Sequence, residues 1–160
     1  MQITIRTLVK QSKAAVKERF TSDLFLALNP PFPPVKLKRF DGCKKGDKVA
    51  LELNFMLFKQ DWVSDITDDG ESDQEWYFVD RGIKLPFFLE TWEHRHIVRE
   101  VNGEASIIDD IQFSTGFGLT DLLMYPVLYL QFLYRKPIYR KYFNKKKAAL
   151  RPLFNVKKFF

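Results

Sequence analysis

Residues 88–115 read FLETWEHRHIVREVNGEASIIDDIQFST and contain the most informative local pattern in the chain. Asn102 and Gly103 stand between two alternating segments, and an Asn-Gly pair in that position is typical of a two-residue type I′ hairpin turn. Such a turn fixes the register of the two strands, so that His96 lies directly opposite Asp109. The stretch therefore predicts a long antiparallel hairpin.

Side chains alternate between the two faces of a strand, so the register also assigns residues to faces. One face carries Trp92, His94, His96, Val98, Ile107, Asp109, Ile111 and Phe113. The other face is more polar and places Arg95 opposite Asp110, for which we expect a surface ion pair worth about 0–1 kcal/mol. We expect the first face to point inward, with both histidines of the chain and one carboxylate among apolar side chains.

The segments around this hairpin predict more strands, two short helices before them and a long helix at the end. The expected elements are a strand over 2–9, helices within 12–28, strands over 35–40, 49–57, 62–67 and 75–80, and a helix over 119–147. We expect a turn at Asp68, Asp69 and Gly70, and a kink or division of the last helix at Pro137. The fold class is α+β: a curved antiparallel sheet of about seven strands, in the order β-α-α-β6-α, wrapped around a long C-terminal helix.

Several short stretches occur in the order found in one known superfamily. They are LNPP at 28–31, FDG at 40–42, GD at 46–47, FVD at 78–80, LPF at 85–87, WEHRH at 92–96, Asp110 and YRKP at 134–137. With the order of elements, they resemble the START-like, helix-grip superfamily (SRPBCC), and within it a bacterial ligand-binding subgroup. That superfamily includes lipid-transfer domains, the birch-pollen allergen group and aromatase/cyclase-type proteins. The resemblance implies a hydrophobic cavity between sheet and helix, and it fixes neither ligand nor reaction.

His94, His96 and Asp109 allow three interpretations. They could form a satisfied polar group in a packed interior, hold a polar group of a ligand, or act as acid and base. We expect Asp109 to orient His96 and to raise its pKa, while burial acts in the opposite direction. A metal site is not predicted, because catalytic zinc sites usually have three protein ligands and this set matches none of them well.

Apolar residues on the other elements complete the candidate ligand-binding set. Beyond the hairpin residues Trp92, His94, His96, Asp109, Ile111 and Phe113, it contains Phe55, Trp76, Phe78, Val127, Leu130 and Tyr134. The last three share one predicted face of the terminal helix with Leu123. Plain core packing is the alternative for each apolar member.

Composition places the chain among ordinary globular proteins. Its 160 residues are 46% hydrophobic, which fits one domain over 1–147 with a basic aromatic tail over 148–160. Cys43 is the only cysteine, so an intrachain disulfide is impossible and a reducing compartment is favoured. The N-terminus has no signal-peptide pattern and the longest apolar stretch, 122–133, is too short to span a membrane, so we expect a cytoplasmic protein. No motif for a cofactor is present.

Charge is distributed unevenly. The stretch 61–80 holds eight acidic residues, whereas the segment from Arg135 to Phe160 holds ten Lys and Arg and no acidic residue. Basic residues mixed with aromatics suit an anionic membrane surface, and less well nucleic acid. The alternative is a solvated helix end followed by a tail that packs on the domain.

Taken together, the sequence favours a binding protein over an enzyme. The predicted function is a carrier or sensor of a lipid-, polyketide- or isoprenoid-like molecule. The alternatives are a cyclase- or dehydratase-type enzyme that uses the His–Asp pair, and a peripheral membrane protein that acts through its basic tail.

Overall fold

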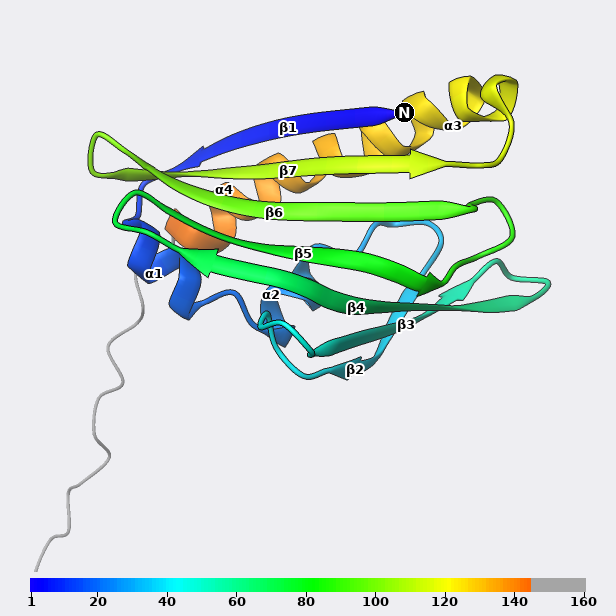
Figure 1. The fold of residues 1–160 in the computed structure, drawn as a ribbon, viewed down its shortest axis with the longest axis horizontal. Helices are drawn as coiled ribbons and strands as arrows, with labels where there is room; N and C mark the ends of the chain where they lie inside the picture. Colours follow the sequence, from blue (N-terminus) through cyan, green and yellow to red (C-terminus); the bar gives the residue numbers. More distant parts are fainter. Residues whose placement is uncertain (145–160) are drawn as a thin grey trace, which may run out of the picture.

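The computed structural model describes residues 1–144 as an α+β fold with one seven-stranded antiparallel sheet (Figure 1). The elements are β1 Gln2–Val9, α1 Lys13–Glu18, α2 Ser22–Ala27, β2 Val35–Phe40, β3 Lys48–Asn54, β4 Lys59–Glu71, β5 Glu75–Lys84, β6 Thr91–Val101, β7 Glu104–Ser114, α3 Gly118–Leu133 and α4 Arg135–Asn144. The strand order is β1-β7-β6-β5-β4-β3-β2, so six strands form a meander and β1 pairs with its last strand. The predicted fold class is confirmed, whereas the predicted boundary at 147/148 lies outside the described residues.

The β6–β7 hairpin has the predicted register throughout. Asn102 and Gly103 have φ values of 53° and 80°, the left-handed conformation that a type I′ turn requires of both residues. His96 pairs with Asp109, and the other predicted pairs follow on either side. The Asn-Gly turn therefore sets which side chains of both strands face the interior.

The outer face of this hairpin differs from the prediction. Arg95 lies opposite Asp110, but its guanidinium lies 4.2 Å from the centre of the Tyr77 ring and 3.9 Å from a Glu75 oxygen. Asp110 instead accepts hydrogen bonds from side chains of β1. The predicted Arg95–Asp110 pair is wrong because the flanking strands β5 and β1 offer nearer partners to both groups.

The acidic stretch is also arranged differently. Asp68, Asp69 and Gly70 are not a turn but part of β4, which continues to Glu71 past a bulge after Ile66. Asp and Gly are rare in strands, which is why the composition predicted a turn. The strand tolerates these residues because their polar side chains make hydrogen bonds at the surface. For example, the Tyr77 hydroxyl donates to Asp68 at 3.0 Å.

The terminal helix is divided, but one turn earlier than predicted. α3 ends at Leu133 and α4 begins at Arg135, so Pro137 lies in the first turn of α4. Proline is tolerated there because the first turn of a helix does not use its backbone N–H groups. None of the described helices is both long and apolar enough to cross a membrane.

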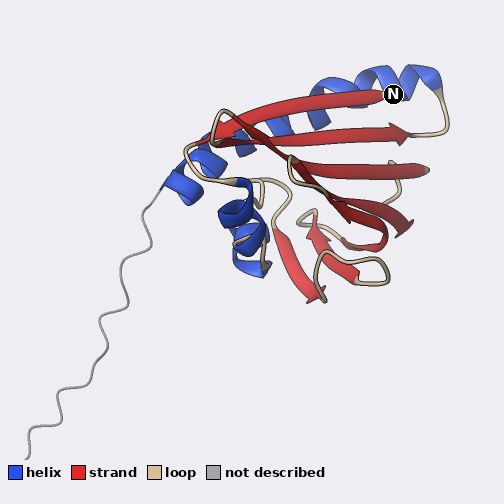
Figure 2. Cartoon of the chain, turned by 60° about the vertical axis from the view of Figure 1, so that its left-hand side comes forward, coloured by secondary structure: helices blue, strands red, loops and turns tan. Residues whose placement is uncertain are grey.

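The helices cover one face of the curved sheet, which we call the inner face (Figure 2). One core cluster joins α1, α2 and α4 to the inner face, and its largest fully buried side chains include Tyr139 and Phe143 of α4. A second cluster joins α3 to β1, β6 and β7.

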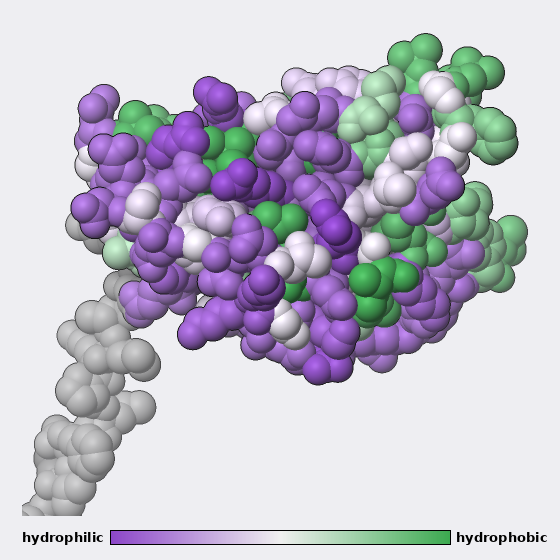
Figure 3. Space-filling view, in the orientation of Figure 1, coloured by the Kyte–Doolittle hydropathy of each residue, from purple (hydrophilic) through white to green (hydrophobic). Residues whose placement is uncertain are grey.

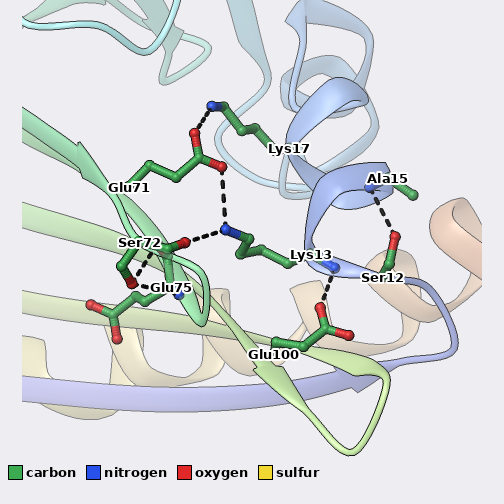
Figure 4. A network of polar contacts seen from close by, with 8 residues as sticks. All are labelled: Ser12, Lys13, Ala15, Lys17, Glu71, Ser72, Glu75 and Glu100. Carbon is green, nitrogen blue, oxygen red and sulfur yellow. Dashed lines mark hydrogen bonds and ion pairs between the residues drawn. The ribbon is translucent and has the colours of Figure 1, made fainter.

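Polar contacts hold α1 against the ends of two hairpins (Figure 4). The backbone N–H of Lys13 donates to Glu100 of β6 at 2.7 Å, and the Lys13 ammonium pairs with Glu71 of β4 at 3.2 Å. Lys17 pairs with the same Glu71 carboxylate. These contacts fix α1 across one end of the curved sheet.

Candidate ligand-binding cavity

A cavity of about 460 Å³ lies between the inner face and helices α2 and α3. Most of its lining is aliphatic or aromatic, including Val49, Leu51 and Leu53 of β3. Ligand pockets of small molecules typically measure about 300–1,000 Å³ and have such a lining with few polar groups. The cavity is therefore large enough for a small organic molecule.

Exposed lining residues mark where the cavity reaches the surface. Phe32, Phe87 and Val127 line it and are 54%, 71% and 48% exposed. Apolar surface gathers at this end of the molecule, around the start of α3 and around the β3–β4 turn, where Leu57 is almost fully exposed (Figure 3). An apolar molecule can thus approach the cavity over apolar surface.

The structure places the predicted ligand-binding residues in three groups. Those that line the cavity are Phe55, Trp92, His94, His96 and Val127. Those that are buried in the core beside it are Trp76, Phe78, Ile111, Phe113 and Asp109. Leu130 and Tyr134 lie outside the lining and are 61% and 44% exposed.

The expectation for Leu130 and Tyr134 rested on the wrong stripe of α3. The stripe that packs inward contains Met124, Leu128 and Phe132, which follow residues of the predicted stripe by one or two positions. α3 is apolar on almost every side, so periodicity alone does not identify the face that meets the sheet.

The polar centre of the site is a contact between His94 and Asp109. His94 Nε2 lies 3.0 Å from Asp109 Oδ1, whereas His96 Nδ1 lies 3.9 Å from the same oxygen. The Tyr139 hydroxyl donates to that oxygen at 3.4 Å. The prediction that Asp109 orients His96 is therefore corrected: the residue directly opposite is not the closest partner, because the His96 ring stacks on Phe78 with centroids 4.3 Å apart.

Burial dominates the ionisation of this group. Burial lowers the pKa of His94 and of His96 well below the usual range, and for His96 it outweighs the opposite effect of Asp109. Burial likewise raises the pKa of Asp109. Both imidazoles are therefore neutral at pH 7. While Asp109 is ionised it can only accept, so His94 Nε2 carries the proton and Nδ1 keeps the lone pair.

Five polar residues of the cavity were not among the predicted site residues. They are Ser64, Asp80, Asn29, Gln131 and Arg135. Strand alternation could have found the first two, because Ser64 continues the inward set of Trp62 and Ile66 as Asp80 continues that of Trp76 and Phe78. The position of Arg135 depends on how α4 begins after α3, and no comparable pattern in the sequence predicts this.

His94, His96 and Asp109 have possible ligand atoms within 4.8 Å of one another. However, the two rings lie face to face, with centroids 3.6 Å apart and planes inclined by 33°. One ion about 2.0–2.1 Å from a nitrogen of each ring cannot lie in both ring planes. The positive charge of Arg135 also acts on all three residues and disfavours a cation. As arranged, this group fits a metal poorly.

The predicted membrane-binding segment is described only as far as Asn144. Within that part, Tyr139 and Phe143 are fully buried in the core, so they are not available to a membrane. The rest of the segment, including 148–160, lies outside the described residues.

Comparison with known proteins supports the fold. No family model and no curated protein matches the chain. A protein from Chromobacterium violaceum has a similar structure with a TM-score of 0.66 at 13% identity, covering 91% of this chain and 99% of that one. Major latex-like protein 151 from Panax ginseng gives 0.59 at 12% identity, with 91% and 98% covered.

An aromatase/cyclase from Streptomyces sp. R1128 is also similar, with a TM-score of 0.57 at 12% identity over 86% of this chain and 90% of that one. Identities this low show the fold alone. The chain has a helix-grip fold like that of these structures, consistent with the predicted resemblance to START-like (SRPBCC) proteins.

Proposed function

We propose that this protein binds a hydrophobic small molecule, lipid-, polyketide- or isoprenoid-like, as a carrier or sensor. The observation that carries the proposal is the cavity of about 460 Å³ with a mainly apolar lining. Burying apolar ligand surface there supplies affinity at about 25 cal/mol per Å². The polar lining residues, among them His94 and His96, set the orientation of the bound molecule.

A second candidate is an enzyme of the cyclase or dehydratase kind. The contact of His94 with Asp109 favours it, since an imidazole held by a carboxylate at a cavity is the usual arrangement of a general base. It predicts that His94→Gln abolishes turnover of a substrate while leaving its binding intact. We favour the carrier because Asp109 and both rings are buried among aromatic side chains, with Phe132 edge-on to His94.

Binding is tested with the neutral fluorescent probe N-phenyl-1-naphthylamine. Leu51→Trp places an indole into the cavity lining, whereas Leu8→Trp makes the same change on exposed surface away from it. We expect Leu51→Trp to weaken probe binding by about tenfold or more and Leu8→Trp to leave it unchanged. Equal binding by both variants and the wild type would place the probe elsewhere and refute the proposal. Native mass spectrometry of the purified protein then tests for a bound molecule.

A further inference from the structure

Asp80 is a carboxylate in the wall of an apolar cavity. It lies on the inner face of β5, directly opposite His94, and is only 8% exposed. Its Oδ1 atom has no hydrogen-bond partner within residues 1–144. Burial raises the pKa of Asp80 to about 6, so at pH 7.5 the group is ionised and can only accept hydrogen bonds.

The side chain of Ser64 is a neighbour of this carboxylate. The Trp62 indole N–H donates to Ser64 Oγ at 3.1 Å, which leaves the Ser64 hydroxyl hydrogen free for another acceptor. Ser64 lowers the pKa of Asp80, but burial has the larger effect and raises it. Oδ1 of the carboxylate has no hydrogen-bond partner among the described residues. A buried carboxylate oxygen without a donor is costly, so its position in a ligand-sized cavity indicates that the donor comes from the ligand.

We infer that the Asp80 carboxylate accepts a hydrogen bond from a hydroxyl group of the bound molecule, which is therefore an alcohol or phenol with an otherwise apolar body. This inference rests on the proposed binding function and names its ligand class. Arg135 lines the same cavity, and its positive charge acts on Asp80. The two side chains carry charges of opposite sign. Arg135 would repel an ammonium group of a ligand and Asp80 would repel a carboxylate, so a neutral hydrogen-bond donor fits the site best.

The test compares two probes that differ only in the donor, 2-naphthol and 2-methoxynaphthalene, as competitors of N-phenyl-1-naphthylamine at pH 7.5. The wild type should bind 2-naphthol about tenfold more tightly than its methyl ether, because only the naphthol can donate to Asp80. In Asp80→Leu the two affinities should become equal within about twofold, while the ether still binds. Asp65→Leu makes the same change on the outer face of β4 and should keep the tenfold preference.

Each other outcome is decisive. If both probes bind but the preference persists in Asp80→Leu, or does not exist in the wild type, the assignment to Asp80 is wrong and the cavity remains a binding site. If 2-naphthylmethylammonium binds more tightly than 2-naphthol, the site takes a cation and the hydroxyl assignment is wrong. If the fluorescent probe itself does not bind, the proposed function and this inference both fail. If it binds but neither naphthalene displaces it, only this inference fails. Should Asp80→Leu not fold, Asp80→Asn removes the charge at constant shape and must lower the preference to about threefold.

Discussion

Replacing Asp80 by asparagine should stabilise the protein above pH 6, with a gain that shrinks as the pH falls. Burial raises the pKa of Asp80 from 3.8 to about 6 in the folded protein. One pKa unit corresponds to about 1.36 kcal/mol, so the ionised carboxylate costs about 3 kcal/mol of stability at pH 7.5. Asparagine has nearly the same shape and no charge, so it avoids this cost.

The sign follows from proton binding. The folded state holds the proton on Asp80 more tightly than the unfolded state does. This contribution to stability is therefore complete below pH 3.8 and is lost as the pH rises through 6. Between pH 5 and pH 7.5 the wild type should lose about 1.4 kcal/mol relative to Asp80→Asn.

Urea unfolding of both proteins at pH 5, 6 and 7.5 measures this difference. Every other titrating group is common to the two proteins, so its contribution cancels in the comparison. Asp73→Asn makes the same substitution at an exposed position and serves as the control. A difference between wild type and Asp80→Asn that is constant from pH 5 to 7.5 would show that Asp80 is not a buried carboxylate.

Two further changes test the hairpin and the polar group behind it. Tyr139→Phe removes the hydroxyl that donates to Asp109 and should lower the free energy of unfolding by about 1 kcal/mol, measured by urea unfolding; an unchanged value would mean that the hydroxyl contributes nothing. Gly103→Ala should lower the free energy of unfolding by about 1 kcal/mol, because the φ of 80° at this position is unfavourable for alanine. A Cβ atom there would meet no other atom within 4 Å, so a steric clash is not the cause. Gly118→Ala, at the start of α3 and equally free of close neighbours, should instead stabilise the protein, so loss of stability in both alanine variants would contradict the reasoning.

Local chemistry made part of the site predictable. The Asn102–Gly103 turn admits essentially one register, and alternation then assigns His94, His96 and Asp109 to the interior. Strand alternation also places Ser64 and Asp80 on the inner face, but polar residues are usually expected to face solvent. Their inward position can be predicted only when the face of the strand that meets the core is already known.

Other features depended on contacts between distant segments. Arg95 and Asp110 are opposite each other, yet Arg95 contacts β5 and Asp110 contacts β1. An exposed charged side chain can pair with any suitable group within its reach, and the sequence does not show which strands lie beside it. Asp68 and Asp69 belong to a strand because β5 pairs with them, in spite of their low preference for strands.

The sequence by itself determined the order of elements, the hairpin register and the burial of both histidines, since these follow from turn chemistry and strand alternation over a few residues. Only the tertiary structure decided which histidine contacts Asp109, which stripe of α3 packs inward, and that Asp80 and Arg135 share a cavity. Side-chain contacts depend on how helices and strands from distant parts of the chain pack together, and in an almost uniformly apolar helix no local pattern identifies the side that will meet them.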